Sequence, residues 1–317
     1  MSNNLSVISQ PIFLVGAERS GTTLLRLMLD RHPNIAFHSE FEFVVDYFQN
    51  NCYPSLDDYY EYLATDRIFQ SGNWSIDRSL NYPNLVNSFL LQKQEITGKL
   101  FVGATVHRHF DRLLKIWSDA KFIHLVRDGR DVARSCVNMN WAGNVWTGCD
   151  RWLIVERLWS QLKVNLDPDR YIEVRYETLI TQPEIILANL CNFIGTKYSS
   201  KMLNYPQYST YKLPNLELLW QWKHKLSASE IRLLEAKIGN ILLEHDYELS
   251  QLPPLTVNQI RDLTLKLHSK FAVILGRINI YGLQLILSSF VARHFQLKQW
   301  QKQILLQCND IDTARLK

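Results

Sequence analysis

The sequence predicts an α/β fold in which helices cover both faces of a central parallel sheet, followed by a helical C-terminal extension. Three observations predict it. Short apolar runs alternate with stretches of helical spacing over the first two-thirds of the chain, a glycine-containing turn follows the first run, and the pattern from Leu216 onward is almost entirely helical. Alternating strands and helices are typical of parallel sheets, which are buried on both faces.

The first unit is a strand, a glycine turn and a helix. Ile12 to Val15 is a short apolar run that stops at Gly16, as expected for a buried strand. Helical spacing of leucines then extends from Thr22 to Arg31. His32-Pro33 ends that helix, because the residue before a proline avoids the helical region.

Later strands and helices follow in the same alternation. Strands are expected at 101–106, 121–126 and 171–175, and helices from Asp131, over 183–194, over 227–247 and, as one or two helices, over 256–307. Segment 37–50 is aromatic and acidic, and 57–100 is polar with short helices. Gly16, Arg127 and Tyr176 fall at or just past strand ends, where parallel sheets bind ligands. We therefore expect these three residues to face one site.

Composition and charge exclude several classes of protein. The 317 residues are 46% apolar and carry a net charge of only +4, too little to argue for nucleic-acid binding. Residues 255–317 hold nine Lys/Arg and three Asp/Glu, a local charge of +6. We expect a main domain over 1–254 and a basic helical extension over 255–317. Five scattered cysteines without a CxxC pair predict reduced thiols, and the absence of a leader or spanning pattern predicts a cytoplasmic protein.

The turn after the first strand has the glycine spacing of a phosphate-binding loop. Residues 16–23 read GAERSGTT, with Thr22 at the position of the usual lysine. Such a loop wraps an anion with backbone N–H groups at a helix N-terminus. Without the lysine it suits a ligand of lower charge than a nucleoside triphosphate, held by Thr22, Thr23 and Arg19 without a metal. The alternative is an ordinary turn whose Ser and Thr cap the helix.

A family resemblance becomes specific at this loop. FLVGAERSGTTLLRLMLDRHP resembles the 5'-phosphosulfate loop of sulfotransferases that use 3'-phosphoadenosine-5'-phosphosulfate (PAPS), particularly the tyrosylprotein type and bacterial relatives. The resemblance covers roughly residues 11–250. It implies a P-loop-like domain, an enzyme that moves a sulfuryl group from PAPS to an acceptor hydroxyl, and no metal. The acceptor is left open among small molecules, carbohydrates, lipids and peptide tyrosine. The loop's implied cofactor residues are Gly16, Arg19, Ser20, Gly21, Thr22 and Thr23.

A second segment is similar to the family's 3'-phosphate motif. FIHLVRDGRDVARS places Arg127 at a strand end and Ser135 eight residues later on a helix. Arginine offers a fixed fork of donors to a phosphate, and serine adds a hydroxyl. The alternative is a surface ion pair between Arg127 and Asp131 with a solvated Ser135. Arg130 and Arg134 are expected to be structural or solvated.

The segments that would contact the adenine and the far end of the cofactor resemble the family less specifically. RYETL resembles the family's RYEDL segment, in which the tyrosine contacts adenine, so Tyr176 is the implied contact. Donors from a variable Ser- and Lys-containing segment correspond here to Ser209, Tyr211 and Lys212. Of these three, Lys212 is the one that we predict to bind the cofactor.

The resemblance also implies a catalytic base. Counting from His32-Pro33, Glu40 falls at the position of the glutamate base of the tyrosylprotein type. Phe37, Phe41 and Phe43 surround it in sequence, and we expect them to desolvate Glu40 and raise its pKa. Glu42 is expected to be a solvated loop carboxylate.

The sequence departs from its relatives where many of them have Gly-Asp-Lys-Thr-Pro. Here residues 103–107 read GATVH, so Thr105 takes the place of the lysine that helps stabilise the leaving group. His107, Arg108 or His109 are candidate substitutes, and Arg19 is expected to bear more of this role. The predicted catalytic residues are therefore Glu40, Arg19 and His107.

Alternatives remain for the function and for two segments. A P-loop kinase would need ATP and Mg²⁺, and the missing loop lysine speaks against it. A nucleotide-binding scaffold without turnover is supported by Thr105. The Trp-rich segment 138–152 predicts either an acceptor pocket or core packing. The extension predicts either peripheral contact with an anionic membrane or partner, or a terminal helix packed on the domain with a solvated basic face.

Overall fold

A five-stranded parallel sheet forms the centre of the protein. The structure, a computed structural model, describes residues 8–48 and 52–316. The strands lie in the order β2-β3-β1-β4-β5, and all four pairings are parallel. Their bounds are β1 Ile12–Val15, β2 Ile35–Glu40, β3 Phe101–Val106, β4 Lys121–Val126 and β5 Tyr171–Arg175. The predicted α/β fold is confirmed, and β2 is the strand that the sequence did not predict.

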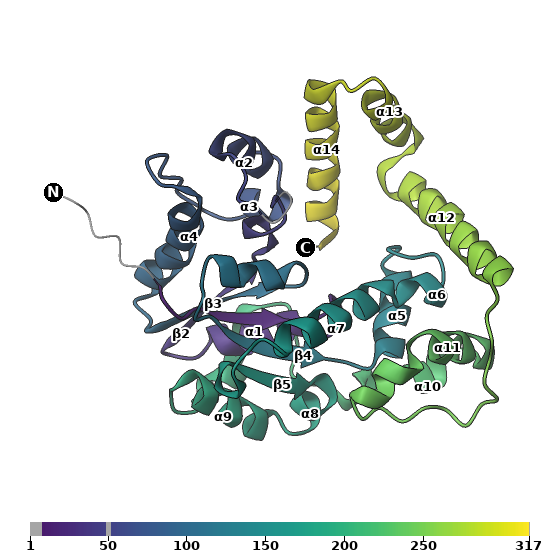
Figure 1. Cartoon of the computed structure of the whole chain (residues 1–317), viewed down its shortest axis with the longest axis horizontal. Coiled ribbons are helices and arrows are strands. Elements are labelled where there is room, and N and C mark those ends of the chain that lie inside the picture. The colour runs from purple at the N-terminus through teal and green to yellow at the C-terminus, as the bar shows by residue number, and fades with distance from the viewer. Residues whose placement is uncertain (1–7, 49–51, 317) are drawn as a thin grey trace.

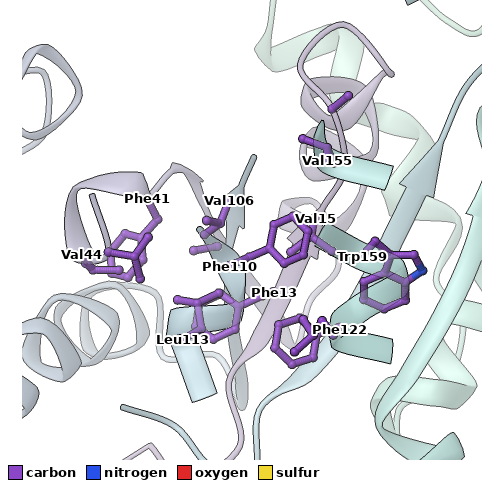
Figure 2. Close-up of a cluster of buried hydrophobic side chains, with 14 of the residues drawn as sticks. Phe13, Val15, Phe41, Val44, Val106, Phe110, Leu113, Phe122, Val155 and Trp159 are labelled. Carbon is purple, nitrogen blue, oxygen red and sulfur yellow. The ribbon is translucent and has the colours of Figure 1, made fainter. Parts of the chain in front are cut away.

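Successive residues of β1 point into two separate hydrophobic cores. Phe13 and Val15 face the core formed with α4, α5, α7 and α11, part of which Figure 2 shows. Ile12 and Leu14 face the second core, formed with α1, α8 and α9. This alternation is the two-residue period of a strand buried on both faces. Helices therefore cover both sides of the sheet (Figure 1).

The helices agree with the predicted alternation. The described chain contains α1 Thr22–Asp30, α2 Leu56–Leu63, α3 Arg67–Gln70, α4 Tyr82–Thr97, α5 Gly129–Asn138, α6 Val145–Gly148, α7 Asp150–Lys163, α8 Tyr176–Thr181, α9 Pro183–Ile194, α10 Trp222–Lys225 and α11 Ala228–Glu244. Helix α5 begins two residues before the predicted start, since the Asp128 side chain accepts a hydrogen bond from the backbone N–H of Arg130 and caps it.

The strand order places an opening at the carboxyl end of β1. This strand lies between β3 and β4, and the chain leaves it toward β2 on one side and later returns to β4 on the other. Connections that diverge from a central strand leave a crevice at its carboxyl end, where α/β proteins bind ligands. The loops after β1, β3, β4 and β5 all meet at this edge.

The C-terminal extension forms an arm of three helices, one more than predicted. They are α12 Gln259–Tyr281, α13 Leu283–His294 and α14 Lys298–Leu316, and Figure 1 shows α14 returning toward the main domain. The arm packs on the domain near its two ends, where Ser269 donates to or accepts from Thr147 at 2.6 Å and Asn309 donates to the Thr65 carbonyl. Most of its side chains are exposed, and α12 packs against α6 and the segment before it through hydrogen bonds of Asn144 and Trp146, so both alternatives for the extension stay open.

No described helix by itself is long and apolar enough to cross a membrane, whereas α12 and α13 together reach that length and composition across a bend of 113°.

Candidate functional site

Two glycines shape the loop between β1 and α1. A Cβ atom on Gly16 would lie 2.3 Å from the carbonyl oxygen of Leu125, so only glycine allows the chain to leave β1 so close to β4. Gly21 has a φ of 97°, and a Cβ atom there would lie 2.4 Å from the Tyr176 ring. The loop therefore rests directly on the elements that follow β4 and β5.

The N-terminus of α1 has no capping side chain among the described residues. Gly21 is the N-cap residue, which overturns the alternative that Ser or Thr caps this helix. Ser20 is fully buried, and its hydroxyl has no hydrogen-bond partner in the described chain. The backbone of Arg19 is left-handed, with φ 72°. Uncapped N–H groups and the positive end of the helix dipole make this a site for an anion.

A cavity of about 490 Å³ lies at this end of the sheet. All predicted nucleotide residues line it except Gly16 and Ser20, which belong to the same loop as Arg19 and Gly21. The predicted residues that line it are Arg19, Gly21, Thr22, Thr23, Arg127, Ser135, Tyr176 and Lys212, joined by Leu24, Asp131, Arg134, Ile180, Tyr211, Leu213, Pro214, Asn215, Leu218 and Gln221. Four of these side chains are cationic and one is a carboxylate, so the cavity is suited to an anionic ligand.

Arg127 joins three segments of the cavity wall. Its guanidinium donates to the carbonyls of Arg19 at 3.2 Å and Leu218 at 2.9 Å, and lies 3.5 Å from the Asp131 carboxylate. The same group lies 4.5 Å from the centre of the Tyr176 ring. The pair with Asp131 thus exists, but it is not on the surface, because the Arg127 and Asp131 side chains are 14% and 1% exposed. Arg127 Nε is buried without a hydrogen-bond partner among the described residues.

Ser135 is held by the loop rather than solvated. Its hydroxyl accepts a hydrogen bond of 2.9 Å from Arg19 Nε, which links residues 116 positions apart. Arg134 lines the cavity too, and donates to the Gln221 side chain at 2.6 Å. Arg130 is structural, as predicted, since it is buried in ion pairs with Asp128 and Glu235.

Tyr176 and Lys212 close the remaining sides. Tyr176 is the first residue of α8 and is buried, which raises the pKa of its phenol. Its ring packs against Gly21 and the Arg127 guanidinium. Lys212 and Tyr211 line the cavity with exposed side chains, whereas the Ser209 hydroxyl turns back to the Tyr205 carbonyl and is absent from the described lining.

Glu40 lies outside the described lining of the cavity, at the end of a strand that β3 separates from β1. It is the last residue of β2, is partly exposed and pairs in register with Thr105 of β3. The neighbouring phenylalanines belong to the cores. Phe37 lies in the core with α1, and Phe41 and Phe43 lie in the opposite core.

A buried hydrogen-bonded chain links Glu42 to the phosphate loop. Glu42 Oε1 lies 2.6 Å from His107 Nδ1 and accepts a 2.9 Å hydrogen bond from the His107 backbone N–H. His107 Nε2 lies 3.0 Å from the Thr22 hydroxyl. The prediction that Glu42 is solvated is wrong, because it is 1% exposed. His107 lies 65 residues from Glu42 in the sequence, so no local sequence pattern predicts this pair.

Charge stabilises protonated His107. Burial by itself lowers the pKa of His107, but the Glu42 carboxylate, helped by Glu18 and Glu40, outweighs burial and raises it. Burial likewise tends to raise the pKa of Glu42, but His107 holds it below its ordinary value. Of the other candidate substitutes, Arg108 forms an ion pair with Asp46, and His109 is exposed.

The Trp-rich segment is mostly core. Trp152 is fully buried and donates to the Arg127 carbonyl at 2.9 Å, which supports the end of β4. Trp146 is buried and donates to Asp262 of α12. Trp141 is the exposed member, with Arg151 stacked 5.0 Å from its ring centre.

Sequence comparison finds one family. A family model described as "Sulfotransferase family" matches residues 11–200. A putative protein-tyrosine sulfotransferase of Caenorhabditis briggsae is 27% identical over 212 residues, which cover 63% of this chain and 71% of that protein. Protein-tyrosine sulfotransferase 2 of Gallus gallus is 26% identical over 212 residues, covering 62% of this chain and about half (54%) of that protein.

Two solved structures have a similar fold. A sulfotransferase domain from the curacin biosynthetic pathway aligns with a TM-score of 0.59 and 18% identity, over 77% of this chain and 100% of that domain. The sulfotransferase domain of the Synechococcus PCC 7002 olefin synthase aligns with a TM-score of 0.51 and 20% identity, over 79% of this chain and 99% of that domain.

Proposed function

This chain belongs to the sulfotransferase family, and on that premise we propose that it transfers the sulfuryl group of PAPS to an acceptor hydroxyl. One observation carries the proposal. A single cavity joins the uncapped N-terminus of α1 to Arg127, Ser135 and the Tyr176 ring. A nucleotide with a charged group at each end of one adenosine needs this combination of two anion-binding regions and an aromatic contact.

The donors present fit such a ligand. Thr22, Thr23 and the N–H groups of α1 would hold the 5'-phosphosulfate, and Arg127 with Ser135 would hold the 3'-phosphate. Two polar atoms fit an anionic ligand: the Ser20 hydroxyl in the loop and Nε of Arg127 are buried and lack partners in the described chain. Buried donors normally have partners, so these two atoms support the proposal of an anionic ligand.

We propose that transfer needs no metal ion. Mg²⁺ is bound mainly by carboxylates and phosphates. Asp131 is the one carboxylate among the described residues lining the cavity, and it already faces Arg127 and accepts from the backbone N–H of Trp222 at 2.7 Å. The negative charge of the ligand is instead met by Arg19, Arg127, Arg134 and Lys212.

The proposed reaction is an in-line displacement at sulfur. Glu40 accepts the proton of the acceptor hydroxyl as the new O–S bond forms. The bond between sulfur and the bridging oxygen breaks, and its electron pair stays on the 5'-phosphate. Thr22, Arg19 and His107 stabilise that charge, as positioned donors do in other group transfers. The position of Glu40 at the end of β2, beside the loop but outside the nucleotide cavity, supports its role on the acceptor side.

Titration calorimetry tests the nucleotide. We expect the desulfated product, 3'-phosphoadenosine-5'-phosphate (PAP), to bind without added metal and Mg·ATP to bind far more weakly, because ATP lacks the 3'-phosphate that Arg127 would hold. The control is adenosine 5'-phosphate, which should bind more weakly than PAP. Heat from Mg·ATP together with none from PAP would contradict the proposal and favour a kinase.

An acceptor screen then tests the reaction itself. Labelled PAPS is supplied with a tyrosine peptide, a simple phenol, a carbohydrate and a hydroxylated lipid, and products are detected by mass. The relatives named as protein-tyrosine sulfotransferases make the tyrosine peptide the first acceptor to try. PAP binding without transfer to any class would support the scaffold alternative.

We also propose that the arm contacts an anionic membrane surface. Its helices expose many large apolar side chains, among them Phe271, Leu287, Phe290 and Phe295. The same segment carries a charge of +6, which complements acidic lipid headgroups such as those of a cytoplasmic leaflet. Exposed apolar area beside basic residues is the pattern of helices that lie in a membrane interface.

Vesicle flotation tests this contact. We expect the protein to float with vesicles containing phosphatidylglycerol and not with pure phosphatidylcholine, and binding should weaken as salt rises. A Phe271→Ser/Phe290→Ser/Phe295→Ser variant should lose flotation. Ile185→Ser, which removes an exposed apolar side chain from α9, is the matched control and should behave as wild type. Unchanged flotation of the triple variant, or a dimer that covers the arm in solution, would contradict the proposal.

A further inference from the structure

The chain from Glu42 to Thr22 spans three elements that meet beside the phosphate loop. Glu42 lies in the short 3₁₀ turn after β2, His107 follows β3, and Thr22 begins α1. All three side chains are nearly inaccessible to solvent, at 1%, 5% and 3% exposed. Thr22 also lines the nucleotide cavity, so the chain has one end in the core and the other at the ligand.

Protonation of His107 decides which way the Thr22 hydroxyl points. Nδ1–H donates to Glu42, and Nε2 faces the Thr22 oxygen. If Nε2 carries no proton, it accepts a hydrogen bond from the Thr22 hydroxyl, which turns that O–H away from the cavity. If Nε2 is protonated it donates to Thr22, and the threonine proton is free to donate to an anion in the cavity. A hydroxyl has one proton to give, so these two states exclude each other.

The surrounding charges favour the second state. Glu42 lies in contact with the imidazole, and Glu18 and Glu40 add negative charge from the loop and from the end of β2. Together they raise the pKa of His107 despite its burial. Arg108, the cation near Glu42, is itself held by Asp46. The sign is clear: protonated His107 is favoured below its raised pKa and is lost as pH rises through that value.

Thr105 brings no charge to this end of β3. By the family resemblance it stands in place of a lysine, and its hydroxyl is buried without a hydrogen-bond partner among the described residues. His107, the residue that follows β3, is therefore the candidate cation of this segment.

We propose that Glu42 is a positioning residue that acts through His107, placing a positive charge behind Thr22 and directing the Thr22 hydroxyl at the 5' group of the nucleotide. The inference rests on the proposed function for its ligand, but the Glu42–His107 arrangement itself is a property of the free protein. Glu42 would not touch the nucleotide. Its effect reaches the ligand only while His107 is present.

A double-mutant cycle tests this dependence. PAP affinity is measured by calorimetry for wild type, Glu42→Gln, His107→Gln and the double variant. Each single variant should weaken binding about 10- to 100-fold, the effect of losing one charge-assisted hydrogen bond. The double variant should bind no more weakly than His107→Gln, because Glu42 has no other route to the ligand. Additive losses would overturn the proposal.

The molecule provides a matched control for the cost of removing a buried carboxylate. Glu156 is 0% exposed and contacts His124 and His245, and it does not line the nucleotide cavity. Glu156→Gln should lower thermal stability as Glu42→Gln does, yet leave the dissociation constant of PAP within about twofold. An equal loss of affinity in this control would show that any buried Glu–His pair matters only for folding, and would overturn the proposal.

Proton NMR of the free protein separates this inference from the function. The His107 ring signal is assigned by its loss in His107→Gln, and its titration is followed in wild type and Glu42→Gln. We expect the wild-type midpoint to lie above that of an ordinary histidine and to fall by at least about one pH unit in Glu42→Gln. In each protein, PAP affinity should decline as pH rises through the midpoint of His107 measured for that protein. If the His107 midpoint is the same in Glu42→Gln as in wild type, the inference is overturned whether or not PAP binds. If the midpoint falls as expected but PAP does not bind, the proposed function is overturned instead.

Discussion

Glu40→Gln is expected to lower kcat by about 10²- to 10⁴-fold while the dissociation constant of PAP changes by less than about twofold. Glutamine keeps the size and polarity of the side chain but does not accept the proton of the acceptor hydroxyl. Glu40 lies at the end of β2 and outside the described lining of the cavity, so nucleotide binding should survive. The measurements are single-turnover transfer from labelled PAPS and calorimetry with PAP.

The control for this variant is a carboxylate that lies neither in the nucleotide cavity nor near Glu40. Glu95→Gln on α4 removes an exposed side chain and should leave transfer unchanged. If Glu40→Gln transfers sulfate at the wild-type rate, the base is another group. A parallel loss of PAP affinity would instead place Glu40 in the nucleotide site and count equally against the assignment.

Arg127→Met is expected to weaken PAP binding by about 2–4 kcal/mol, or roughly 30- to 1000-fold. Methionine retains much of the apolar stem but removes the guanidinium that would meet the 3'-phosphate. The loss should depend on that phosphate. Adenosine 5'-phosphate, which lacks it, should lose clearly less affinity than PAP does, only the part that comes from the loop and turn that Arg127 holds in place. Calorimetry with the two nucleotides on the two proteins gives the four values required.

Arg130 provides the contrast for this prediction. It is three residues from Arg127, but its guanidinium is buried in ion pairs with Asp128 and Glu235. Arg130→Met leaves buried carboxylates without their partner, and should cost about 3–5 kcal/mol in the free energy of unfolding. Its effect on PAP affinity should be only a few-fold. If the nucleotide preference of Arg127→Met is unchanged and Arg130→Met loses it, the two roles have been assigned the wrong way round.

Local pattern was enough to predict most of the sheet and the loop. The runs that became β1 and β4 are short, mostly apolar and bounded by glycine, proline or polar residues, which is how buried parallel strands appear in sequence. Strand β2 was missed because its first half is buried on both faces while its second half, from His38, is partly exposed. Neither a continuous apolar run nor a regular alternation results from that combination.

Partners distant in sequence account for what the sequence did not predict at the site. Glu42 lies in an aromatic and acidic run, so its sequence suggests a solvated carboxylate, and only the fold brings His107 to it. The contact between Arg19 and Ser135 also depends on the pairing of β1 with β4. Residue types at the end of each strand were predictable, whereas their hydrogen bonds to one another required the register of the sheet.

The bonds made by Arg127 have a consequence for how fast a ligand enters. One guanidinium already ties the phosphate loop, helix α5 and the turn at Leu218 together in the free protein. The conformational entropy of ordering these three segments is therefore lost when the chain folds and not when the nucleotide binds. Association should then be a one-step encounter, with a rate that rises linearly with nucleotide concentration and shows no slow rearrangement afterwards.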